Sequence, residues 1–171
     1  MINDNKLIFL KQIDGIDFYR YKASLFKYFY KPIAYYEKLF TRSIRETIDY
    51  VRGKYRVIYM AKEDEIIGYG IVTRGGGRYK FCTRKDVVFN SLYIVPKERG
   101  NGYGKLLVGA FLKELGIQYD KAYEHIRDNN IASIKVAEQC GFVKVSSAKR
   151  VGLLQNIVSC DEGILGIYEC S

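Results

Sequence analysis

Residues 92–105 read LYIVPKERGNGYGK, and this stretch decides the fold. The apolar run over residues 87–95 is typical of a buried strand, and Pro96 ends that strand because proline has no backbone N–H for the sheet. A glycine-rich turn follows, and the apolar spacing after it predicts a helix over residues 102–115. The buried face of this helix is expected to be formed by Leu107, Phe111 and Leu115, with Gly104 and Val108 beside them.

The glycine turn, residues 99–104, is suited to bind a phosphate group. Glycine has no Cβ atom, so the backbone can approach a ligand closely. The N–H groups in the first turn of a helix and the positive end of its dipole attract anions, and Arg99 and Lys105 add positive charge at the rim. The turn therefore predicts a phosphate-bearing ligand. The alternative is a tight connection that needs small residues for packing alone.

Two common phosphate-binding loops do not fit this turn. A Walker loop needs GxxxxGK[ST], but the spacing from Gly100 to Gly104 is one residue too short and Lys105 is followed by leucine. A dinucleotide-binding turn needs GxGxxG, whereas Gly100, Gly102 and Gly104 are spaced two apart. Glu124 does lie about twenty residues further on, where such a fold places its acid, but no second β-α-β half follows.

The rest of the chain reads as a mixture of helices and strands. Residues 18–52 predict two helices separated by Pro32, and the segment 18–30 is aromatic and basic. That segment either packs as an amphipathic helix or grips a substrate or a nucleic-acid strand by stacking and charge. Further elements are expected as strands over residues 56–62, 66–73, 119–126, 142–145 and 164–168, and as a short helix over residues 130–140 that ends at Gly141. We expect one α/β domain over residues 1–171 with a mixed sheet.

The composition argues against membrane-spanning, secreted and metal-binding proteins. Of the 171 residues, 48% are hydrophobic, which is enough to bury a core, and no apolar run reaches the roughly 18 residues that span a membrane. The first residues carry two acids and no signal-peptide pattern, so we expect a soluble, cytoplasmic protein without a membrane partner. The net charge of +9 favours anionic partners such as nucleic acid, an acidic surface or a polyphosphate cofactor. Four cysteines without a CxxC pair and a single histidine give no basis for a metal site.

The glycine turn belongs to a longer motif with a known counterpart. The pattern Arg99-x-x-Gly102-x-Gly104, with Pro96 at the end of the preceding strand, resembles the signature of the GNAT superfamily of acyl-CoA-dependent N-acyltransferases. The resemblance covers residues 87–145, and the strands expected over residues 56–73 are consistent with the early strands of that family.

A second motif supports the same resemblance. Residues 126–130 end a strand with Asn130, a short helix follows, and Gly141-Phe142 closes the motif. The form with Ser133 three residues after Asn130 looks most like the branch that includes ribosomal-protein N-terminal acetyltransferases. A lone glycine turn would be a weak signal, whereas two motifs in the right order and spacing are specific.

The resemblance implies a single-domain GNAT-like fold with a central, mostly antiparallel sheet, flanking helices, and two parallel strands that splay apart at the cofactor cleft. It implies acetyl-CoA as co-substrate, with the pantetheine arm on one splayed strand and the pyrophosphate on the amides of the glycine turn. An amine would attack the thioester directly in a ternary complex, while a backbone N–H near Ile94 stabilises the oxyanion. The cofactor-binding residues expected from the resemblance are Leu92, Tyr93, Ile94, Arg99, Gly100, Asn101, Gly102, Tyr103, Gly104, Lys105 and Asn130.

The chain departs from the family at the positions that handle protons. Many relatives carry a tyrosine four residues before the glycine of Gly-Phe, where it protonates the leaving thiolate, and this chain has Ala137 there. Ser133, one helical turn earlier, is the candidate acid, with helix capping as the alternative. His125 stands where other relatives place a carboxylate base and is the candidate base, with a structural role as the alternative. Weaker candidates flank Val88, where some relatives carry a glutamate, and are Asp86 and Asn90.

The sequence therefore predicts a transferase that moves an acetyl group from acetyl-CoA to a primary amine. The acceptor could be a peptide or protein N-terminus, an amino sugar or another small amine, bound by residues 18–52 and the glycine loop 75–77. The excess positive charge favours an acidic or ribosome-associated acceptor, and we expect a monomer or homodimer. Two alternatives remain: an acyl-CoA-binding module without catalysis, and a basic nucleic-acid-associated protein.

Overall fold

The computed structural model describes residues 2, 4–22, 48, 51–53, 55–113, 116, 118–153 and 155–171. Within these residues nine strands form a mixed sheet, accompanied by the helices α2 (Tyr103–Lys113) and α3 (Ile131–Gln139). Neither helix is long and apolar enough to cross a membrane. Two compact units, each described by itself below, comprise Met1–Ile71 with Leu92–Arg99 and Val72–Ser91 with Gly100–Ser171. A single domain over residues 1–171 stays a prediction.

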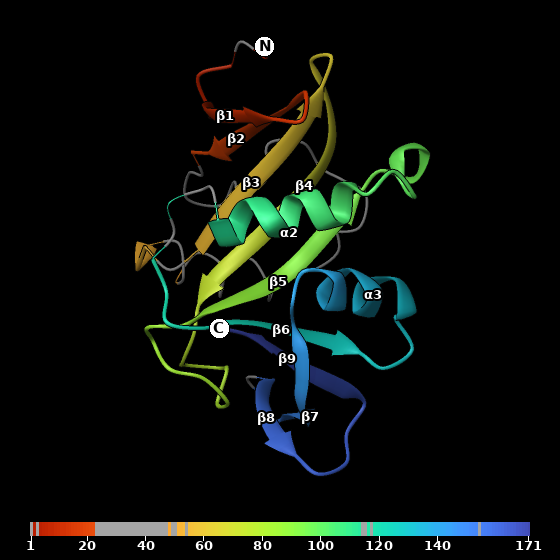
Figure 1. Ribbon diagram of the computed structural model, residues 1–171. Coiled ribbons are helices and arrows are strands. Elements are labelled where there is room, and N and C mark those ends of the chain that lie inside the picture. Colours follow the sequence, from red (N-terminus) through yellow and green to blue (C-terminus); the bar gives the residue numbers. More distant parts are fainter. Residues whose placement is uncertain are drawn as a thin grey trace. The chain divides into compact units, whose positions relative to one another are not determined.

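The first unit is built on a meander of strands. β1 (Leu7–Ile13) and β2 (Ile16–Tyr21) form an antiparallel hairpin, and β2 pairs antiparallel with β3 (Tyr55–Lys62), as Figure 1 shows. Next in the order are β4 (Glu65–Arg74) and β5 (Val87–Ile94), of which residues 65–71 and 92–94 belong to this unit. A short 3₁₀ helix, η1 (Pro96–Glu98), follows β5.

Strand β2 corrects the helix predicted over residues 18–52. Its first residues lie in a strand because Asp14 (φ 50°) and Gly15 (φ 76°) form a two-residue turn with two left-handed positions, which suits the twist of a β-hairpin. Aromatic and β-branched side chains then favour the extended backbone over the helix. Ile48 and Val51 are helical, as predicted. Pro32 and most of the aromatic, basic segment 18–30 lie outside the described residues.

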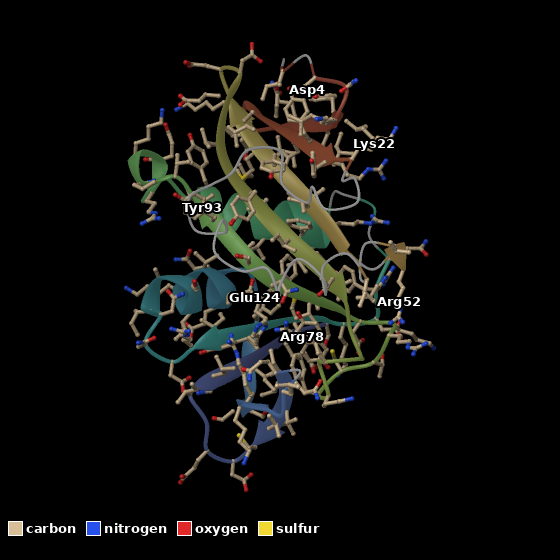
Figure 2. All side chains as sticks on the ribbon, turned by 180° about the vertical axis from the view of Figure 1, so that it is seen from behind. Asp4, Lys22, Arg52, Arg78, Tyr93 and Glu124 are labelled. Atoms are coloured by element: carbon tan, nitrogen blue, oxygen red, sulfur yellow. The ribbon has the colours of Figure 1, made fainter. Side chains whose placement is uncertain are left out.

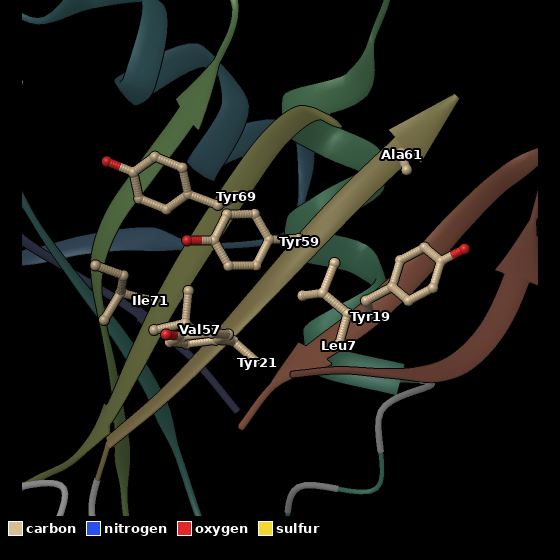
Figure 3. Close-up of a cluster of buried hydrophobic side chains, with 8 residues drawn as sticks. All are labelled: Leu7, Tyr19, Tyr21, Val57, Tyr59, Ala61, Tyr69 and Ile71. Atoms are coloured by element: carbon tan, nitrogen blue, oxygen red, sulfur yellow. The ribbon is translucent and has the colours of Figure 1, made fainter. Parts of the chain in front are cut away.

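Tyrosines fill the core of the first unit. Figure 3 shows the cluster, which consists of Leu7, Tyr19, Tyr21, Val57, Tyr59, Ala61, Tyr69 and Ile71. The ring of Tyr59 lies 6.1 Å from that of Tyr21 and 5.9 Å from that of Tyr69, in tilted and edge-on arrangements that aromatic quadrupoles favour. The sheet face that carries these rings is therefore fixed by packing of large, rigid side chains.

The second unit carries both described helices. Its strands follow the order β4-β5-β6-β9-β7-β8 and include β6 (Ala122–Arg127), β7 (Val143–Val151), β8 (Asn156–Cys160) and β9 (Leu165–Cys170). The predicted helices and the predicted strands at β5, β6, β7 and β9 agree with this arrangement. β8 is an additional strand that the sequence did not indicate.

The parallel pairing between β5 and β6 is short. β5 and β6 pair only from Val87 to Phe89 and from Ala122 to Glu124, although β6 continues to Arg127. Phe89 packs its ring edge-on against Phe111 of α2, with the centroids 5.3 Å apart. The strands therefore separate directly after the Phe89–Glu124 pair, on a sheet whose one face is covered by α2. This agrees with the splayed parallel strands that the resemblance implied.

Two glycine substitutions test the packing of the fold in opposite directions. Gly68→Ala would place a Cβ atom 2.6 Å from the carbonyl oxygen of Tyr93, so we expect a loss of about 1–3 kcal/mol in the free energy of unfolding. Gly109→Ala in α2 meets nothing within 4 Å, so we expect a gain of roughly 0.5–1 kcal/mol from helix propensity. Urea denaturation of both variants measures these changes. A Gly68→Ala variant as stable as the parent protein would contradict the described β4–β5 contact.

Candidate active site

The glycine turn leads into the first turn of α2. Gly100 (φ 86°) and Gly102 (φ 79°) have left-handed backbones, and a Cβ atom at either position would meet nothing within 4 Å. The backbone conformation thus requires glycine there, and the space beside it is open. Leu106 N–H donates to Gly102 O over 3.0 Å and begins the helical ladder, and no acidic residue lies in the first turn of α2. The turn therefore presents a helix N-terminus with no negative charge of its own to an incoming anion.

Helix α3 packs against this turn. A Cβ atom at Gly104 would lie 3.3 Å from Cγ2 of Val136, so the glycine allows α2 and α3 to approach closely. Cys140, at the end of α3, donates its thiol to the carbonyl oxygen of Lys105 over 3.7 Å. Lys105 itself is exposed at the start of α2. The glycine turn is therefore held by contacts on one side and faces solvent on the other.

Asn130 begins α3 and accepts the backbone N–H of Ser133 through its side-chain oxygen over 3.3 Å. This capping bond fixes the orientation of the amide and leaves its Nδ2 atom as a hydrogen-bond donor. The structural role considered for this segment is thus present, with Asn130 as the cap and Ser133 as the capped residue. The Ser133 hydroxyl is half-buried one turn before Ala137, which is fully buried.

Two consecutive residues of β6, Glu124 and His125, lie on opposite faces of the sheet. Glu124 is the register partner of Phe89 and lies on the face that α2 covers. Its carboxyl is 4% exposed, and its Oε1 atom has no hydrogen-bond partner among the described residues. Burial raises the pKa of Glu124 to about 8. The carboxyl therefore holds its proton at neutral pH.

His125 lies on the opposite face, half-buried, with its ring centroid 5.7 Å from that of Tyr79. The Tyr79 hydroxyl donates to Oδ1 of Asn90, and Nδ2 of Asn90 donates to the Thr73 hydroxyl over 3.1 Å. This polar chain runs from β4 across β5 to the loop after β4. The ring of His125, the candidate base, thus packs beside Tyr79, whose hydroxyl begins this hydrogen-bonded chain.

The glycine loop after β4 is anchored to β8. Lys80 N–H donates to Ile157 O over 2.9 Å, and Ile157 N–H donates to Arg78 O over 2.8 Å. Asp86, one of the weaker candidates for a base, closes the same loop because it accepts both the N–H and the hydroxyl of Thr83, over 2.7 and 2.8 Å. We assign Asp86 to loop structure on this geometry.

In the first unit, the end of β5 is organised around Tyr93. Its ring stacks on that of Tyr69 with the centroids 5.6 Å apart. The Arg99 guanidinium lies 5.7 Å from the Tyr93 ring centroid, and Arg99 Nε donates to the carbonyl oxygen of Ile94 over 3.0 Å. The positively charged guanidinium of Arg99 therefore lies beside the end of β5 and already donates one hydrogen bond there.

The predicted cofactor residues fall into both units. Those of the second unit lie in the glycine turn, which contacts α3 at Val136 and Cys140, and at the N-terminal cap of α3; they are Gly100, Asn101, Gly102, Tyr103, Gly104, Lys105 and Asn130. Those of the first unit are Leu92, Tyr93, Ile94 and Arg99. Their roles toward a cofactor stay predictions.

A model of the acetyltransferase (GNAT) family matches residues 18–142 of the chain. The chain belongs to the acetyltransferase (GNAT) family. This confirms the family and the acyltransferase class that the two motifs predicted. No curated protein sequence matches the chain.

Solved structures share the fold of this GNAT protein at low identity. The yncA protein of Salmonella typhimurium, solved with acetyl-CoA, is 21% identical, with a TM-score of 0.52 over 75% of this chain and 70% of that one. The ribosomal L7/L12 α-N-protein acetyltransferase RimL, with coenzyme A, is 14% identical, with a TM-score of 0.55 over 75% and 68%. Spermidine N-acetyltransferase from Vibrio cholerae, with coenzyme A and spermine, is 15% identical, with a TM-score of 0.52 over 75% and 70%.

Sequence reasoning missed the buried carboxyl of this GNAT protein. The sequence indicates Glu124 only as a possible dinucleotide-binding acid, because its burial depends on which strands flank β6. A glutamate inside a run of strand-forming residues was the available signal, since strands with an alternating pattern rarely place an acid among buried positions.

The titration of Glu124 predicts how stability changes with pH. The folded-state pKa of about 8 lies above the ordinary value of 4.5, so its contribution to stability is complete below pH 4.5 and is lost as the pH rises toward 8. At about 1.4 kcal/mol per pKa unit the loss is up to about 5 kcal/mol. Glu124→Gln has no such titration, so we expect the difference between the two proteins to grow over this range. Urea unfolding at a series of pH values measures it, and a constant difference would contradict the buried, unpaired carboxyl.

Proposed function

We propose that this GNAT protein moves an acetyl group from acetyl-CoA to a primary amine. The observation that carries the proposal is the glycine turn at the start of α2, held against α3 and its Asn130 cap in the order and spacing of the family motifs. The open, positively polarised helix start suits the pyrophosphate of coenzyme A. Nδ2 of Asn130 supplies a donor to the cofactor from α3.

The reaction is a direct transfer within a ternary complex. The amine attacks the thioester carbonyl, and a backbone N–H near Ile94 stabilises the oxyanion. The amine must lose a proton, for which the His125 imidazole, held beside Tyr79, is the proposed base. The thiolate must gain one, and Ser133 is the acid that the motif suggests. No covalent enzyme intermediate is involved.

The acceptor is proposed to be acidic. The solved relatives include enzymes that act on spermidine and on a ribosomal protein N-terminus, so the fold accommodates both small and macromolecular amines. With a net charge of +9, this chain repels a polyamine and attracts a peptide with acidic residues. We therefore favour the N-terminus of an acidic peptide or protein, with a cytoplasmic location and a monomer or homodimer as part of the proposal.

One observation favours a second function. Ala137 replaces the usual tyrosine and is fully buried, so it cannot supply an acid. A protein that binds acyl-CoA without transferring the acyl group would tolerate this change. The two functions differ in turnover, because only the transferase releases free coenzyme A when an amine is added.

Reversing one charge at each end of α2 tests the cofactor site. Lys105→Glu places a negative charge at the proposed pyrophosphate position, and we expect acetyl-CoA to bind at least about tenfold more weakly, since a charged hydrogen bond contributes roughly 1.5–3 kcal/mol. Lys113→Glu, at the other end of the same helix, changes the net charge equally and is the matched control. Calorimetric titration with acetyl-CoA measures both. Equal affinities for the two variants would exclude the start of α2 as the anion site.

An acceptor comparison tests the charge argument. We expect a peptide with acidic residues behind its free N-terminus to give a higher kcat/KM than spermine at low salt, with the advantage decreasing as salt screens the field. Release of coenzyme A with each amine provides the rate. A preference for spermine that persists at low salt would reject an acidic acceptor.

A further inference from the structure

Glu124 is the last residue of β6 that pairs with β5, at the point where the two strands separate. Its register partner on β5 is Phe89, and its partner on β9 is Tyr168. Phe89 packs against Phe111 of α2, so Glu124 lies on the face of the sheet that the helices cover. Figure 2 marks Glu124 on this strand. A buried carboxyl at this point is unusual because its register partners on both neighbouring strands, Phe89 and Tyr168, are aromatic.

The same layer contains the alanine that replaces the family's tyrosine. Ala137 O accepts the N–H of Phe142 over 3.0 Å, and the Phe142 ring lies 5.9 Å from that of Phe89. Phe89 is in turn the register partner of Glu124. Ala137 and Glu124 are therefore connected by one set of packed rings, on the same side of the sheet. The layer that lacks a tyrosine hydroxyl on α3 therefore contains a carboxyl on β6.

The Glu124 carboxyl is not committed to any described group. It is 4% exposed, and its Oε1 atom accepts no hydrogen bond from the described residues. Among the described residues, two titratable groups lie near it: Tyr168, its register partner on β9, and Cys140 at the end of α3. Its negative form would raise the pKa of the Cys140 thiol, which places the two groups near each other. No described cation pairs with this carboxyl, so burial favours its protonated form.

We propose that Glu124 is the general acid that protonates the thiolate of coenzyme A as it leaves. This inference rests on the proposed acetyl transfer and specifies the source of its second proton. It replaces Ser133 in that role, because a serine hydroxyl is a far weaker acid than a protonated carboxyl. It also explains why Ala137 is tolerated.

The proton balance of the step is complete. Attack by the amine forms a C–N bond, and the carbonyl electrons move to oxygen. The nitrogen then loses one proton to solvent, on the His125 side of the sheet. When the oxyanion collapses, the C–S bond breaks and sulfur takes the carboxyl proton of Glu124. The carboxylate is reprotonated by water, which returns the proton that the amine released.

Three variants test the proposal in the full-length protein. Glu124→Gln keeps the shape but cannot donate a proton as an acid, and Glu124→Leu makes the layer fully apolar. Glu138→Gln removes an exposed carboxylate from α3 and is the control for the loss of one negative charge. Each is assayed for acetyl-CoA binding by calorimetry and for release of coenzyme A with the acidic peptide and with spermine. Rates are measured as a function of pH.

We expect Glu124→Gln and Glu124→Leu to bind acetyl-CoA as the parent does and to lose on the order of 100-fold in kcat, the usual contribution of a general acid. The parent rate should fall above about pH 8, where Glu124 ionises, and this descending limb should be absent in Glu124→Gln. Glu138→Gln should match the parent throughout. A merely structural carboxyl would change stability but leave kcat of Glu124→Gln equal to that of the parent at about pH 6, where both proteins are folded.

Three results would overturn the assignment, and they have different meanings. Glu124→Gln with the kcat and the pH profile of the parent rejects Glu124 as the acid while the acetyl transfer stands. A parent protein that binds no acetyl-CoA, or binds it and releases no coenzyme A with either amine, rejects the proposed function and the acid role together. A loss of kcat in Ser133→Ala alone would return the role to Ser133.

Discussion

The short parallel pairing between β5 and β6 is the constraint on which the site depends. Parallel neighbours need a crossover, and here the crossover contains the glycine turn and α2. The helix must pack on the sheet, which it does through Phe111 on Phe89, so its N-terminus is held at a fixed place relative to the strand. Because pairing stops after Phe89 and Glu124, backbone groups beyond this point are not consumed by the parallel ladder. The crossover between β5 and β6 thus places the proposed anion site at the start of α2. The end of their pairing leaves the two strands apart beside it.

Much of this could be predicted from the sequence because it is encoded locally. Gly100 and Gly102 have left-handed backbones that other residues adopt at a cost, Asn130 caps a helix through its own side chain, and Pro96 stops a strand by lacking an N–H. Each of these effects acts within a few residues of its cause. A motif built from such residues therefore identifies both the elements and their order.

The sequence-based predictions failed where residues far apart in the sequence determine the local structure. The segment beginning at Phe18 has an aromatic pattern that fits either a helix or a strand, and its strand depends on pairing with β1 and β3. The Asp14-Gly15 turn was a local signal for that hairpin and was overlooked. β8 pairs with β7 at the end of the sheet order, and only Ile157 of that strand is fully buried, so its pattern is weak. Likewise, the burial of Glu124 follows from the central place of β6 between β5 and β9, which no single stretch of sequence reveals.

The two proposed proton transfers take place on opposite faces of the sheet. Side chains of successive strand residues point to opposite faces, so His125 and Glu124 serve the two sides of one sheet. In an acetyl transfer the amine must lose a proton and the sulfur must gain one, and the two atoms lie on different sides of the carbonyl carbon. A thioester held between separated strands would present its nucleophile side to one face and its leaving group to the other. Two adjacent residues can then perform the two proton transfers without competing, because the sheet itself keeps the base and the acid apart.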